Sequence, residues 1–234
     1  MKRIGAGIAI FAVLLVPSNL TDAQRRGLSD ADANEAMRQV VATYGSFATY
    51  SDKGTCVYHP AGGDRVYTVR FETLFKRPGR LRFAWTQEVD SLPGYQQKGV
   101  IWCDGTTAWL LWSVHGNRLE QKKDLELAVS GAVGASWGAA GTIAKLLCDD
   151  LGEIRRLDEL EGLRIDGNAT EDGVECVVLA GHLDSGTKER IWISREDHLV
   201  RRIEERSKYG THVEVRTQIV IDQEIADSRF SEQG

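Results

Sequence analysis

The chain has 234 residues, with 29 lysines and arginines against 34 aspartates and glutamates, which gives a formal net charge of −5 at pH 7. A protein that binds phosphate backbones gathers a basic excess on one face, so this mild acidity argues against nucleic acid as a partner. The length suits a single β-rich domain with a sizeable core.

The first residues follow the pattern of a secretory signal. Two basic residues precede an uncharged apolar run from Ile4 to Val16, and small residues follow it, ending at Ala23. This pattern predicts a signal peptide over residues 1–23, cleaved after Ala23, and a periplasmic domain over residues 24–234. The run is shorter than the roughly 20 residues of a spanning helix, so we expect no transmembrane segment in the mature chain. An uncleaved membrane anchor is the alternative.

An amphipathic helix is expected near the start of the mature domain. Ser29, followed by acidic residues, is a capping-box-like signal. Apolar residues then recur at three- and four-residue spacing from Ala33 to Phe47. The spacing predicts a helix of about four to five turns, whose apolar stripe covers a sheet.

Two β-hairpins are predicted next, because the apolar pattern changes to a period of two from Gly54 onward. Apolar and polar residues alternate from Tyr67 to Lys76 and again from Leu81 to Thr86, on either side of a Pro-Gly turn. The second hairpin joins Val100–Cys103 to Thr107–Trp112 through the strong turn dipeptide Asp-Gly. Each hairpin is expected to have one apolar face and one solvated face.

The alternation stops between about Lys123 and Asp150, where alanines, leucines and glycines dominate. This composition predicts two short helices with a flexible joint at Gly138 to Gly141. Each glycine costs a helix roughly 1 kcal/mol relative to alanine, so the segment is expected to be loosely held. The pattern is typical both of a mobile lid and of an irregular connection.

The last third of the chain predicts a meander of five strands separated by turn clusters. The strands are Leu163–Gly167, Val174–Gly181, Glu189–Ser194, Leu199–Arg206 and His212–Ile221. In the last of them, Val213 and Val215 are expected on the buried face, and Glu214 and Arg216 on the solvated face.

Residues that carry chemistry are sparse. The serines lack the G-x-S-x-G elbow, and the five histidines lack the H-x-x-x-H spacing. His182 and Asp184 alternate onto one side of a strand end, but two ligands do not make a metal site. We therefore predict no catalytic residue, no metal, no cofactor and no enzymatic activity.

Four widely spaced cysteines argue against a zinc site and against a redox motif. In an exported protein disulfides are chemically allowed, and we expect at least one among Cys56, Cys103, Cys148 and Cys176. Three pairings are open. The alternative is that some cysteines are buried thiols that pack as small apolar side chains.

An apolar, largely aromatic face is the candidate binding surface. Its predicted ligand-binding residues are Tyr67, Val69, Phe71, Phe83, Trp85, Trp109 and Leu111. The simplest account is a core covered by the first helix, since any sheet must bury one face. A large curved sheet leaves a hollow, however, and a few short helices leave room in it for a small ligand.

Three segments carry a resemblance to a known family. Tyr44 to Gly54 reads YGSFATYSDKG, Phe71 to Phe83 reads FETLFKRPGRLRF, and Ile101 to Trp109 reads IWCDGTTAW. With the signal peptide and the helix before them, they resemble the LolA/LolB-like lipoprotein-carrier superfamily, and more closely its branch of predicted periplasmic proteins.

The resemblance implies an α+β, mainly antiparallel β fold. This would be a curved half-barrel sheet whose concave face is covered by an N-terminal helix and two short helices. It also implies binding of an acyl or lipid-like ligand on that face, as carrier or sensor, without catalysis. The glycine-rich insert and the four cysteines depart from the lipoprotein-chaperone pattern. The alternative function is an envelope protein-interaction module, with an envelope protein as partner and the hollow filled by its own helices.

Overall fold

Residues 30–148, 150–152, 154 and 157–233 are described by the structure, a computed structural model. The predicted signal peptide and the capping residue Ser29 lie outside the described residues. No helix in the described part of the chain is long and apolar enough to cross a membrane.

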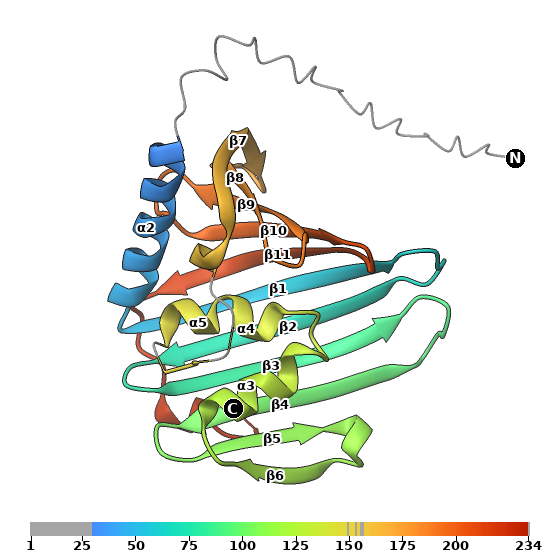
Figure 1. The fold of residues 1–234 in the computed structure, drawn as a ribbon. Helices are drawn as coiled ribbons and strands as arrows, with labels where there is room; N and C mark the ends of the chain where they lie inside the picture. The colour runs from blue at the N-terminus through green and yellow to red at the C-terminus, as the bar shows by residue number, and fades with distance from the viewer. Residues whose placement is uncertain (1–29, 149, 153, 155–156, 234) are drawn as a thin grey trace, which may run out of the picture.

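One antiparallel sheet of eleven strands dominates the molecule (Figure 1). The strands are β1 Thr49–Pro60, β2 Tyr67–Lys76, β3 Arg80–Val89, β4 Gln96–Asp104, β5 Ala108–Trp112, β6 Arg118–Lys122, β7 Glu161–Glu171, β8 Val174–His182, β9 Lys188–Ser194, β10 Val200–Ser207 and β11 Gly210–Ile221. Their order is β6-β5-β4-β3-β2-β1-β11-β10-β9-β8-β7. Two meanders are therefore joined at the centre by the pairing of β1 with β11.

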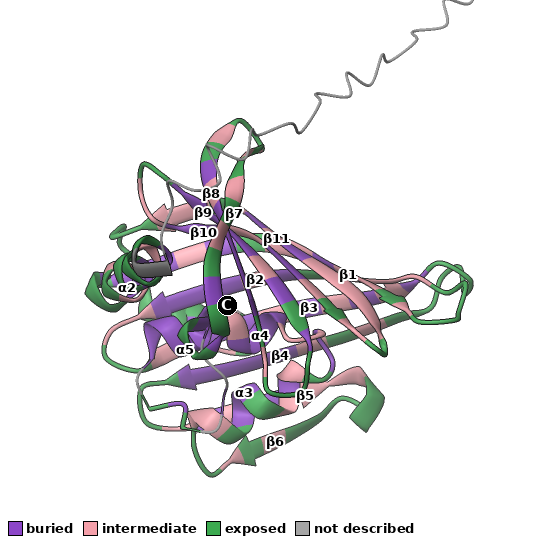
Figure 2. Ribbon diagram, turned by 45° about the horizontal axis from the view of Figure 1, so that its top comes forward, coloured by how far each residue is buried: buried purple, intermediate pink, exposed green. Residues whose placement is uncertain are grey.

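The sheet curves, and the helices lie on its concave face (Figure 1). They are α2 Asp30–Ser46, α3 Leu125–Val133, α4 Ala139–Thr142 and α5 Ala144–Leu147. This arrangement confirms the predicted α+β half-barrel. Figure 2 shows buried residues concentrated where these helices face the strands.

Helix α2 forms because its apolar residues fall on one stripe, as the spacing predicts. Ala33, Met37, Val40, Tyr44 and Phe47 are all buried against the sheet.

The glycine-rich segment forms three short helices rather than the predicted two. Its joint lies at Trp137 and Gly138, which have φ values of 52° and 96° and so break the helix with left-handed backbone. Gly141, expected within the joint, instead lies in α4. A Cβ on Gly141 would lie 3.1 Å from Ile154 Cγ2, so the missing side chain lets α4 pack closely.

The C-terminal residues lie against the convex side of β2 and β3. Lys76 Nζ donates to Asp227 Oδ1 at 2.6 Å, and Arg82 Nε donates to the carbonyl of Ser231 at 3.1 Å. Phe230 is buried in the same segment. The face predicted to be solvated is therefore partly covered here.

All four cysteines are buried, and the structure holds them as thiols rather than in the disulfide that the sequence analysis expects. Cys56 and Cys103 lie on strands β1 and β4, Cys148 follows α5, and Cys176 lies on β8.

Candidate functional site

An aromatic floor forms where β2 and β3 pair on the concave side. Phe71 pairs with Trp85, and Phe83 lies one pleat further along. The Phe71 and Phe83 ring centroids are 5.4 Å apart and stacked, and those of Phe83 and Trp85 are 5.9 Å apart. Val69 is fully buried beside them. The structure therefore brings four of the predicted ligand-binding residues together.

Two glycines let these rings lie flat on the sheet. A Cβ at Gly54 would lie 2.3 Å from the Phe71 ring, and a Cβ at Gly99 would lie 2.1 Å from the Trp85 ring. Both positions are on neighbouring strands, directly opposite the aromatic residue in register. The rings can therefore cover the backbone of the next strand, which makes the floor broad and shallow.

Tyr67 lies at the rim of this floor. Trp137 stacks on Tyr58 with centroids 4.1 Å apart and contacts Tyr67 at 5.5 Å. All three side chains are only half-buried. Trp137, at the joint between α3 and α4, therefore packs against the two tyrosines at the rim of the floor.

Trp109 and Leu111 do not share the floor, which corrects the sequence analysis. Ile101, on the concave side, pairs with Leu110, whereas Trp109 pairs with Trp102 and stacks on it at 6.3 Å. Trp109 and Leu111 therefore lie on the convex face. Both faces of this hairpin are rich in apolar residues, so the pattern alone could not tell which face was concave.

Trp112, which the sequence offers only as a possible member of the aromatic face, belongs to the floor. Its ring contacts that of Trp85 edge-on, with centroids 6.1 Å apart. The same alternation that excludes Trp109 places Trp112 on the concave side.

The hollow above the floor is occupied by α3, α4 and α5. Phe71, Phe83 and Trp85 are 5%, 1% and 3% exposed, so no open pocket lies directly over them. The covering residues are mostly small: Ala128, Ala132, Ala135, Ala139, Ala140 and Ala144 are all buried in the same core.

Three indole N–H groups around this hollow lack an acceptor. The Nε1 atoms of Trp85, Trp112 and Trp137 are buried and form no hydrogen bond. A buried donor without a partner costs about 1–3 kcal/mol, so such groups call for an explanation. Their residue types were visible in the sequence, but the lack of an acceptor depends on packing that no pattern reports.

A buried ionic cluster occupies the other half of the concave face. Arg216 Nε donates to Glu214 Oε1 at 2.6 Å, Nη1 donates to Asp52 Oδ2, and Nη2 donates to the carbonyl of Ala139 at 2.8 Å. Thr142 Oγ1 donates to Glu214 Oε2 at 3.1 Å. The cluster therefore ties α4 to the sheet.

This cluster reverses the predicted faces of the last strand. Glu214 and Arg216 are buried, whereas Val213 and Val215 are only half-buried on the convex side. Alternation cannot distinguish a solvated face from a buried face whose charges neutralise one another.

Two buried tyrosines adjoin the cluster. Tyr50 donates to Asp52 Oδ2 at 2.6 Å, and Tyr44 Oη accepts from the Val200 amide at 3.2 Å. Burial raises the pKa of both phenols above the ordinary value.

A cavity of about 370 Å³ opens between the helical segment and strands β9 to β11. Its apolar walls include Val133, Ile154, Leu157 and Ile203. Its polar side carries glutamates and His212, whose Nε2 lies 3.6 Å from Glu205 Oε2. The cavity borders the joint at Gly138, so it gives access to the edge of the hollow.

No protein-family model and no curated protein sequence matches the chain. Solved structures do. LprF from Mycobacterium bovis matches with a TM-score of 0.51 at 11% identity, over 86% of this chain and 97% of LprF. The lipoprotein LppX from Mycobacterium tuberculosis matches with a TM-score of 0.50 at 11% identity, over 85% of this chain and 99% of LppX. With its curved eleven-stranded sheet and covered concave face, the chain shares the fold of LprF and LppX, the kind of fold that the resemblance to the LolA/LolB-like superfamily predicts.

Proposed function

We propose that the protein is a periplasmic, non-catalytic carrier or sensor that binds an acyl or lipid-like ligand on the concave face. The ligand would lie over Val69, Phe71, Phe83 and Trp85, with Tyr67 at the rim. The observation that supports this most directly is the set of buried indole N–H groups without acceptors around an apolar floor.

The floor suits an acyl chain because it is broad and aromatic; the Arg216 guanidinium lies 4.8 Å from the centre of the Phe71 ring, where the floor meets the ionic cluster. Burying a chain gains about 0.8 kcal/mol per methylene, which for a long chain exceeds the cost of association. The carbonyl oxygens of an acyl ester would supply the acceptors that Trp85 and Trp112 lack. An unbranched hydrocarbon would leave those donors unsatisfied, so the site favours a ligand with a carbonyl group.

The ligand would displace α3 rather than α4. Trp137 is a bulky residue with a left-handed backbone, which stores about 1–2 kcal/mol of strain at the joint. Helix α3 lies on one side of this joint, and α4 on the other side is held by Arg216. The cavity beside the joint gives the ligand a way in.

Replacing Trp85→Phe tests the role of the indole donor. The variant keeps an aromatic ring on the floor and removes an N–H that makes no hydrogen bond in the protein alone. It also leaves a void in the core, so we expect a lower melting temperature with the fold retained. Affinity for a fluorescent acyl ester should fall about tenfold, the equivalent of one hydrogen bond. Trp109→Phe on the convex face is the matched control and should leave the affinity unchanged.

If wild-type protein fails to bind the acyl ester at micromolar concentration, the ligand proposal is wrong. The second candidate is then an envelope interaction module, which the close packing of α3 to α5 over the floor favours. Such a module would bind its protein partner equally well with Trp85 or Phe at this position.

A further inference from the structure

A second cavity, of about 770 Å³, lies among β7 to β10, on the convex side of the sheet. Leu179, Ile191 and Ile203 point from these strands into the main core, so the alternate residues face this cavity. Ala180 lines the cavity between Arg164 and Arg190 in the same cross-strand row, and its small side chain leaves room between them.

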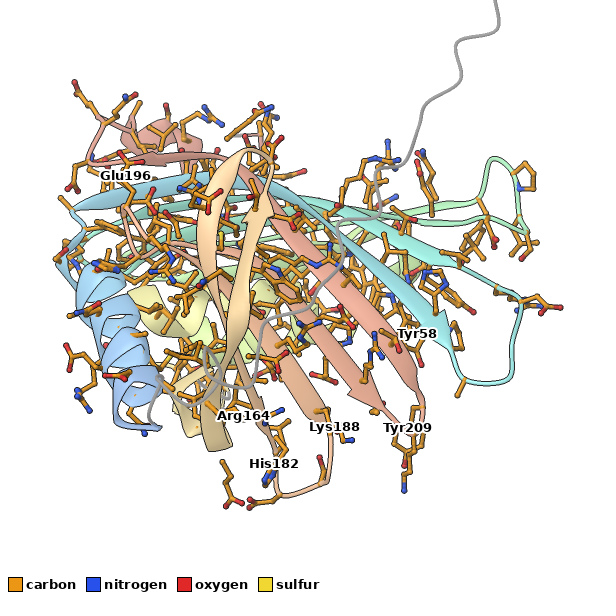
Figure 3. The ribbon with its side chains drawn as sticks, turned by 90° about the horizontal axis from the view of Figure 1, so that it is seen from above. Tyr58, Arg164, His182, Lys188, Glu196 and Tyr209 are labelled. Carbon is orange, nitrogen blue, oxygen red and sulfur yellow. The ribbon has the colours of Figure 1, made fainter. Side chains whose placement is uncertain are left out.

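Basic side chains surround this groove. His182, Lys188 and Arg206 pair directly with one another across β8, β9 and β10. Arg190 lies in the neighbouring row, and Arg164 comes from β7. Figure 3 shows Arg164, His182 and Lys188 close together along this edge of the molecule.

Carboxylates neutralise part of this charge: Asp166, Glu189 and Glu204 line the groove, and Glu161 Oε2 lies 4.0 Å from His182 Nδ1. Asp166 Oδ2 lies 2.9 Å from Arg190 and its Oδ1 lies 4.0 Å from Arg164, so it is shared by two arginines. Glu204 is likewise shared, at 2.6 Å from Arg206 and 3.6 Å from Arg202.

Lys188 makes no ion pair with the described part of the chain. It is exposed, and it stands directly between His182 and Arg206 in the cross-strand row. Like charges placed opposite each other on adjacent strands destabilise a sheet, so this row gains stability when an anion binds to it.

The groove is also partly organised before any ligand arrives. The Arg190 guanidinium lies over the Trp192 ring at 4.9 Å, which limits its motion. The side chains of Arg164, Arg190 and Arg206 remain 56%, 42% and 67% exposed, so their donors can reach a ligand.

We propose that this groove binds an anionic phosphate group, borne by a lipid headgroup or by a small soluble phosphate ester. Forked guanidinium donors and a lysine point charge are the usual partners of phosphate oxygens. The groove lies on the face opposite the hollow, so this inference does not depend on the acyl-ligand proposal.

The test replaces Lys188→Glu in the full mature protein. Because Lys188 makes no ion pair, the variant should fold as the wild type does, which its melting temperature will report. Lys98→Glu is the matched control: it is exposed on the convex side of β4 and changes the net charge equally. Binding is measured to glycerol 3-phosphate and to phosphatidylcholine vesicles with and without phosphatidic acid.

We expect the wild type to bind at least one phosphate source, Lys188→Glu to bind it about tenfold more weakly, and Lys98→Glu to bind it as the wild type does. Binding to phosphatidic acid vesicles without competition by glycerol 3-phosphate identifies a headgroup; binding to glycerol 3-phosphate identifies a soluble ester. The proposal is overturned if the wild type binds neither source, or if the two variants lose affinity equally.

Discussion

The two halves of the concave face are held together in different ways. Over β2 to β5, stacked rings meet small alanines in mainly apolar contacts, and the Arg216 guanidinium, 4.8 Å from the centre of the Phe71 ring, marks the border between the two halves. Over β1 and β11, Arg216 joins two carboxylates and the carbonyl of Ala139 through directed hydrogen bonds. If an apolar ligand binds as we propose, replacing the apolar helix contacts over the first half would leave no hydrogen bond broken, whereas displacing α4 would remove hydrogen-bond partners from Arg216 and Glu214. We therefore expect any exchange of ligand for helix to be confined to the aromatic half.

Arg216→Met should lower the stability of the protein more than any other change proposed here. It leaves Asp52 and Glu214 buried without their cation, and losing one partner of a buried pair costs about 3–5 kcal/mol. Urea unfolding measures the loss. Arg38→Met is the control, since Arg38 pairs with Glu35 in an exposed position and its loss should cost far less stability. Equal losses in the two variants would contradict the role of the buried cluster.

Alkaline pH should destabilise the protein through Tyr44 and Tyr50, the buried tyrosines that adjoin the ionic cluster over β1 and β11. Burial raises the pKa of both above the unfolded value, so their contribution is complete below about pH 10 and is lost as pH rises through the folded values. Each tyrosine should lower the free energy of unfolding by up to about 1.4 kcal/mol per pH unit in that range. Urea unfolding at a series of pH values measures how the free energy of unfolding changes with pH. Tyr44→Phe should reduce that slope by the share of one titrating group, about 1.4 kcal/mol per pH unit. An unchanged slope would contradict the raised pKa of Tyr44.

Much of the fold could be predicted because its local patterns agree with its tertiary structure. The stripe from Ala33 to Phe47 became α2, and the alternation about the Pro-Gly turn became β2 and β3. Strand β6 was not predicted, because Arg118–Lys122 is almost wholly polar and pairs only as an edge strand.

The candidate site could be predicted only in part. Phe71 and Phe83 follow from alternation, but the faces of Trp109 and Arg216 depend on what covers each side of the sheet. The C-terminal residues cover one convex region, and ion pairs make one concave region polar. Both arise from residues distant in sequence, so neither leaves a local signal.

The pairing of β1 with β11 has a consequence for how the chain folds. Val57 lies opposite Val213, so the middle of the sheet, not its edge, joins the two ends of the sequence. High contact order of this kind slows folding to milliseconds or longer, because a long loop must close before the pairing is gained. A chain emerging from its N-terminus cannot complete its central strand pair until the last strand is released. Shortening the C-terminus would therefore remove the middle of the sheet rather than trim its border.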